Sequence, residues 1–93
     1  MDDTTVIQSM TGSGIVREEV WQDSRGAVVR YNLVFINHFL CGVDNGRVLG
    51  YDNSHGFHHK HFKGAVMSFE YKNYDLLLRQ FLAEVSRLRR EKT

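Results

Sequence analysis

Four of the five histidines of this chain lie in the segment YDNSHGFHHKHF, residues 51–62. An imidazole has an ordinary pKa of about 6.5, so it can donate or accept a proton near neutral pH, and its neutral form is a common metal ligand. The segment therefore indicates a site for proton transfer, metal binding or phosphate binding.

A turn signal is expected to bring the fifth histidine, His38, back to this segment. Asn45 and Gly46 stand between two apolar runs, and Asn-Gly is typical of a tight hairpin turn because both central residues need positive φ. A hairpin closed by this turn pairs His38 with Asn53 across two neighbouring strands.

A second tight turn at His55 and Gly56 would place Ser54 opposite Phe57 in the next pair of strands. The same register sets a histidine on each side of one asparagine, and these three residues are His38, Asn53 and His58. Neighbouring strands lie about 4.8 Å apart, so the two histidine Cα atoms would be roughly 10 Å apart, close enough for both imidazoles to reach one phosphate. A contact between His38 and Asn53 could instead serve only to stabilise the hairpin.

The first hypothesis from this geometry is metal-independent RNA cleavage without a cofactor. One imidazole would remove the 2′-hydroxyl proton and another would protonate the leaving oxygen, with His38, His58 and His55 as candidates. A cation, Lys60 or Arg30, would stabilise the negative charge that develops on the phosphate.

Metal binding is an alternative for the other two histidines. His59 and His61 share one strand face because side chains alternate along a strand. They could ligate one metal ion, with His55 or Asp52 as a further ligand. The spacing matches no named zinc module.

The second hypothesis is a non-enzymatic binding module. Residues 27–43 have the pattern of a long strand with apolar odd positions, while the even positions also carry Arg30, Asn32 and His38. An N-terminal segment, a second copy of the chain or a protein partner could cover this second face. Aromatic and basic side chains near its rim also suit single-stranded RNA. The candidate binding residues are Asn53, Lys60, Arg30 and Tyr51.

The elements that must position these residues are four strands and one helix. Alternation and turn signals predict strands at about residues 15–23, 27–43, 48–53 and 57–71, the last with a bulge or bend at Gly64. Asn73 is a plausible N-cap for an amphipathic helix that starts at Tyr74. The predicted fold class is α+β, with an antiparallel four-stranded meander sheet packed against one C-terminal amphipathic helix.

Length and composition limit the organisation of the chain. Its 93 residues fit one domain, which we place at residues 15–93 behind a polar, mobile leader of residues 1–14. The single cysteine, Cys41, cannot form an internal disulfide, and no segment has the pattern of a signal peptide or a membrane helix. We therefore expect a cytoplasmic protein without membrane contact. The net charge of +1 does not by itself predict RNA binding.

Residues 36–62, INHFLCGVDNGRVLGYDNSHGFHHKHF, followed by YDLLLRQFLAEV at 74–85, resemble the TumE-like family of small bacterial proteins. The most specific part is the DNG turn followed by YDNSHG and two histidines. The resemblance implies a growth-inhibiting toxin of a toxin–antitoxin module, encoded with a helix-turn-helix antitoxin. It implies no set of catalytic residues.

Overall fold

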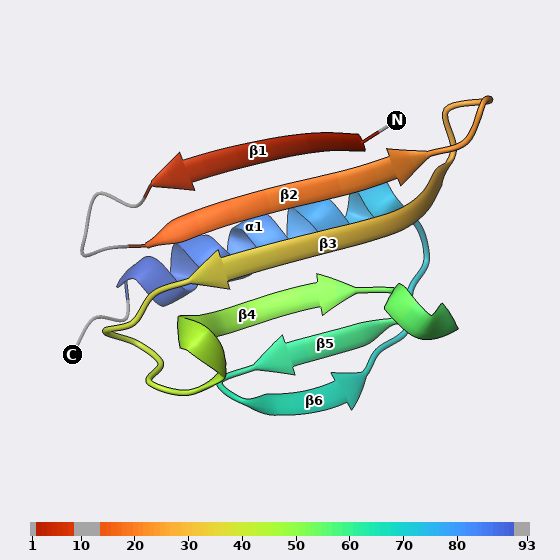
Figure 1. Cartoon of the computed structure of the whole chain (residues 1–93). Coiled ribbons are helices and arrows are strands. Elements are labelled where there is room, and N and C mark those ends of the chain that lie inside the picture. Colours follow the sequence, from red (N-terminus) through yellow and green to blue (C-terminus); the bar gives the residue numbers. More distant parts are fainter. Residues whose placement is uncertain (1, 9–13, 91–93) are drawn as a thin grey trace.

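The computed structural model describes residues 2–8 and 14–90 of the chain. They form one antiparallel sheet of six strands in sequence order and a C-terminal helix (Figure 1). The elements are β1 (Asp2–Gln8), β2 (Ile15–Gln22), β3 (Val28–Ile36), β4 (Arg47–Asp52), β5 (His59–Phe62), β6 (Ala65–Ser68) and α1 (Tyr74–Arg90). The α+β class, the meander order and the C-terminal helix are confirmed, whereas the predicted number of strands is too low.

Two segments account for the additional strands. Residues 2–8, which the sequence assigned to a leader outside the domain, form β1 and pair with β2. The predicted fourth strand is a hairpin of β5 and β6, because Lys63 and Gly64 both have positive φ, of 47° and 92°. The bulge or bend predicted at Gly64 is therefore a tight turn that divides the predicted strand in two.

Strand β3 ends at Ile36, seven residues before the predicted end, because the chain folds around Asn37. The buried Asn37 side chain accepts hydrogen bonds from the backbone N–H groups of Phe39 and Leu40, and the Asn37 N–H donates to the Gly46 carbonyl. Residues 37–46 thus form a loop where the sequence predicted paired strands, and the turn at Asp44–Gly46 is a short 3-10 turn.

This loop changes the register of the central strands. Asp52 lies opposite Asn32, and Tyr51 lies opposite Leu33. The expected pairing of His38 with Asn53 is therefore wrong.

Helix α1 covers one face of the sheet. Its N-terminus is capped as predicted, since the Asn73 side chain accepts a hydrogen bond from the Leu76 N–H. In Figure 1 the helix runs behind β2 and β3. The largest fully buried side chains, which form the centre of the core, are Tyr31, Tyr51, Phe35, Phe81, Leu33, Leu49 and Val48.

The opposite face, here called the open face, has no further layer over it within residues 2–8 and 14–90 (Figure 1). Side chains alternate along each strand, so every strand sends half of its residues to α1 and half to the open face. No helix in the described part of the chain is long and apolar enough to span a membrane.

Candidate functional site

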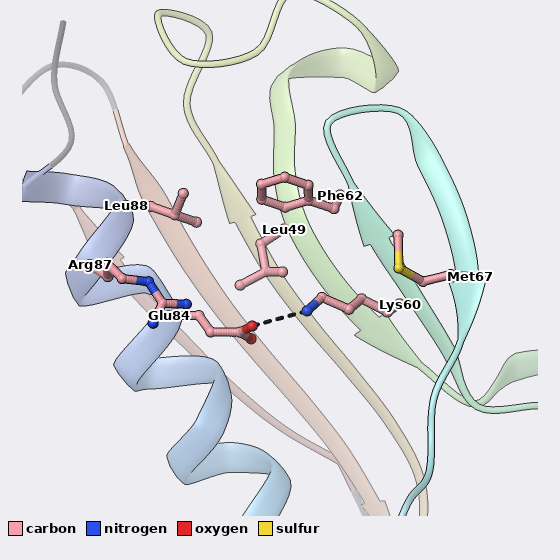
Figure 2. Close-up of a pocket in the computed structure, with 7 residues that line it drawn as sticks. All are labelled: Leu49, Lys60, Phe62, Met67, Glu84, Arg87 and Leu88. Carbon is pink, nitrogen blue, oxygen red and sulfur yellow. Dashed lines mark hydrogen bonds and ion pairs between the residues drawn. The ribbon is translucent and has the colours of Figure 1, made fainter.

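Strand alternation places two of the clustered histidines on the open face. The Lys60 ammonium group is 3.0 Å from a carboxylate oxygen of Glu84 on α1, so Lys60 points toward the helix (Figure 2). Its neighbours His59 and His61 point the other way. Tyr51 also contacts Glu84, and Asp52, the next residue on β4, therefore joins the two histidines on the open face.

Asp52, His59 and His61 form a compact group, here called the open-face cluster. The His61 Nε2 atom is 2.9 Å from Asp52 Oδ2, and the His59 Nδ1 atom is 3.6 Å from Asp52 Oδ1. One ligand atom from each of the three residues lies within 4.8 Å of the other two. Asp52 faces His59 directly across the β4–β5 ladder, so two paired strands hold the group together.

Asp52 carries the negative charge of the cluster. Its side chain is only 13% exposed, and burial alone would raise its pKa. Hydrogen bonds from the Ser54 hydroxyl, the Ser54 backbone N–H and His61 outweigh burial and hold the pKa below its ordinary value. Asp52 is therefore a carboxylate at neutral pH.

A depression of about 180 Å³ lies beside the cluster and shares Asp52 with it. We call it the Trp21 pocket. The Arg30 guanidinium stacks over the Trp21 ring at 4.7 Å from the ring centroid. The pocket thus offers a cation and an aromatic ring next to the carboxylate. Its lining includes Glu19, Trp21, Arg30, Asn32, Asp52 and Ser54.

His38 does not belong to this site. Asn53 bonds to Val29 and Tyr31 near the start of β3, whereas Ile36 is the last strand residue before His38. The strand from Tyr31 to Ile36 is about 17 Å long at 3.3 Å per residue. His38 is exposed in the loop at the far end of β3, where its ring packs against Gly46. The proposed pair of His38 and His58 is therefore not formed.

His58 lies on the helix side among aromatic rings. Its ring stacks on Tyr71 with centroids 4.1 Å apart, and its Nδ1 atom is 2.7 Å from the Tyr31 hydroxyl. The Asn53 side chain bonds to the backbone of β3, because it accepts a hydrogen bond from the Tyr31 N–H and donates one to the Val29 carbonyl. Both residues line a second depression at that end of the sheet, which shares Arg30 and Ser54 with the Trp21 pocket.

The remaining predicted residues are divided between the two faces. Tyr51 is fully buried, and Lys60 is ion-paired beneath the helix at a pocket of about 250 Å³ (Figure 2). Neither can contact a substrate on the open face. Arg30, the other cation offered by the first hypothesis, lies on the open face over Trp21. The side chain of His55 lies outside the described part of the structure.

Sequence reasoning underestimated Asp52 and missed Trp21. The predicted register at the second turn is correct, and its continuation places Asp52 opposite His59. That continuation could have identified the cluster. Trp21 enters the site only because it pairs with Arg30 across β2 and β3, which the sequence pattern alone did not show.

The open-face cluster can bind a cation or move a proton. Two imidazole nitrogens and one carboxylate oxygen converge there, and these groups suit a divalent metal. The sequence offered His55 or Asp52 as a further metal ligand beside His59 and His61. Asp52 is the residue that lies next to the two histidines.

In a comparison with protein families, residues 12–89 match the family described as toxin TumE. No curated protein and no solved structure matches the chain.

Proposed function

Because this chain belongs to the TumE toxin family, we propose that it is an RNA-cleaving toxin whose reaction centre is the open-face cluster. The observation that carries this proposal is that Asp52 belongs both to the convergent cluster and to the Trp21 pocket. A reacting group and a place for a nucleotide are thus adjacent on one exposed surface.

The pocket has the two features that bind single-stranded RNA. A base can stack on the Arg30 guanidinium plane that lies over the Trp21 ring, and the guanidinium N–H groups can pair with a phosphate. The pocket and the histidines together span β2 to β5, a width of about 14 Å at about 4.8 Å between neighbouring strands. That span accommodates a short stretch of RNA.

RNA cleavage requires a proton acceptor and a stabiliser of negative charge. The 2′-hydroxyl oxygen attacks the adjacent phosphorus and its proton passes to the cluster. The P–O5′ bond breaks to leave a 2′,3′-cyclic phosphate, and the leaving 5′-oxygen takes up a proton from water. Arg30 faces the charge that develops on the phosphate oxygens. This assignment replaces His38 and His58 with the residues that the fold brings together.

The test is cleavage of a labelled single-stranded RNA by a catalytic amount of purified protein. We expect His59→Ala to lower the cleavage rate about 100-fold or more. His38→Ala is the matched control, because it removes an exposed histidine far from the cluster and should retain full activity. Undiminished cleavage by His59→Ala would exclude the cluster as the reaction centre.

A non-enzymatic binding module on the same face is the competing function. The exposed Trp21 pocket would then hold RNA or a protein without turnover, and the effect would require stoichiometric protein. Multiple turnovers per chain favour the enzyme. The toxin family also implies an antitoxin partner, and we propose the helix-turn-helix class for it and the cytoplasm as the place where both act.

A further inference from the structure

We infer that Asp52, His59 and His61 bind one divalent transition-metal ion of the Zn²⁺ type. The binding site stands on its own geometry, and the use of the ion in RNA cleavage rests on the function proposed above.

The two separations between Asp52 and the histidines are close to those in a metal site. Zinc binds histidine nitrogen at about 2.0–2.1 Å and carboxylate oxygen at about 2.0–2.2 Å. Two ligands at the corners of such a tetrahedron lie about 3.4 Å apart. The separations of 2.9 Å from His61 to Asp52 and 3.6 Å from His59 to Asp52 lie on either side of that value. Small side-chain rotations would suffice to bring all three ligands to one ion.

The orientation of His61 favours metal binding over direct proton transfer to a substrate. Its Nδ1 atom is buried and has no hydrogen-bond partner among the described residues. Its other nitrogen, Nε2, is directed at the carboxylate of Asp52. Neither nitrogen is presented to a substrate, whereas Nε2 is placed correctly for an ion held between His61 and Asp52.

The surroundings of Asp52 support the same assignment. Metal ligands are usually held by further hydrogen bonds, which fix their orientation. The Ser54 hydroxyl and backbone N–H both donate to Asp52 Oδ1, at 2.7 and 3.2 Å. The carboxylate is thereby held on the side of β4 that faces the two histidines.

The ligand set indicates which ion binds and what it could do. Imidazole suits zinc, copper, iron and nickel, whereas magnesium and calcium prefer sites made of oxygen alone. Three protein ligands leave a fourth position for water, as in catalytic zinc sites. An ion bound there would polarise a phosphate oxygen and lower the pKa of its water.

The test is titration of the full chain, free of any affinity tag, with ZnCl₂ in a calorimeter and without RNA. We expect one ion per chain, and affinity losses of more than about 10-fold in His59→Ala and in His61→Ala, since even outer-shell changes cost that much. His38→Ala should bind as the wild type does. Circular dichroism of each variant verifies that it is folded. His59 is the more exposed of the two histidines, so His59→Ala still tests the site if His61→Ala does not fold.

Absence of one-to-one binding by the wild type would overturn the site, as would equal affinities in His59→Ala and His38→Ala. RNA cleavage by protein stripped of metal with EDTA would overturn the catalytic use of the ion. Zinc binding at the cluster without any RNA cleavage would instead overturn the proposed function and leave the metal site standing.

Discussion

Adjacent histidines of this chain have opposite surroundings. His58 stacks on Tyr71 on the helix side, and His59 and His61 join Asp52 on the open face. The residue type is the same in each case, so the role depends on which side of the strand the residue occupies. Alternation was visible in the sequence, but which of the histidines lie on the open face was not.

We expect His58 to contribute to the stability of the fold and not to RNA cleavage. The change His58→Phe keeps a ring against Tyr71 but leaves the buried Tyr31 hydroxyl without its partner. We expect the free energy of unfolding to fall by about 1–3 kcal/mol, the cost of an unsatisfied buried polar group. Urea unfolding measures this loss.

The double variant Tyr31→Phe/His58→Phe removes both polar partners and should recover much of that loss. Cleavage per folded molecule should equal that of the wild type in both variants. A His58→Phe protein of unchanged stability but without activity would show that His58, and not the open-face cluster, performs the chemistry.

At the scale of elements, the loop after β3 decides the register of the central strands. The Asn-Gly signal was in the correct place, but Asp44, Asn45 and Gly46 all adopt positive φ within a 3-10 turn. Asn37 satisfies the loop backbone with its own side chain. A tight two-residue hairpin was therefore not needed to reverse the chain.

Gly46 is expected to be essential to this loop. Its φ is +81°, and an added Cβ would lie 2.6 Å from two atoms of the His38 ring. Gly46→Ala should lower the free energy of unfolding by about 1–3 kcal/mol, as for other strained backbone positions. Thermal unfolding monitored by circular dichroism measures the change.

Gly42 provides the matched control, because nothing lies within 4 Å of its added Cβ and its φ is not positive. Gly42→Ala should change stability by less than about 0.5 kcal/mol. Adding His38→Ala to Gly46→Ala should restore only the part of the lost stability that arises from contact between the new Cβ and the His38 ring. Equal melting temperatures of the two glycine variants would refute this account of the loop.

At the scale of the whole molecule, a polar contact joins the helix to the sheet. Glu84 accepts hydrogen bonds from the Tyr51 hydroxyl and the Lys60 ammonium group. Burial would lower the pKa of Lys60, but the hydrogen bonds and charge interactions with Glu84 and Tyr51 together outweigh it, and the pKa is raised above its ordinary value. Lys60 is therefore charged and depends on Glu84 for its partner.

Glu84→Gln should test this interlayer contact. An amide can still accept from Tyr51, but it removes the negative charge opposite Lys60, whose side chain is only 22% exposed. We expect a loss of about 1–2 kcal/mol in the free energy of unfolding, measured in urea. Arg79→Gln is the control, since Arg79 and Asp75 form an exposed pair worth less than about 1 kcal/mol. Equal losses in both variants would contradict a special role for Glu84.

The sequence by itself determined the features that depend on neighbouring residues. These are the α+β class, the capped amphipathic helix from Tyr74, and the β4–β5 register that sets Asp52 opposite His59. Turn residues, helix caps and side-chain alternation each act within a few positions, so they can be recognised in the sequence.

Only the tertiary structure decided the β3–β4 register, the separation of His38 from His58, and which histidines lie on the face away from α1. Each depends on contacts between residues distant in the sequence. The register follows from how the residues 37–46 loop satisfies its backbone. Phe81 and its neighbours on α1 bury apolar odd positions of β3, as the sequence predicts. That burial leaves Asp52, His59 and His61 on the face exposed to a substrate.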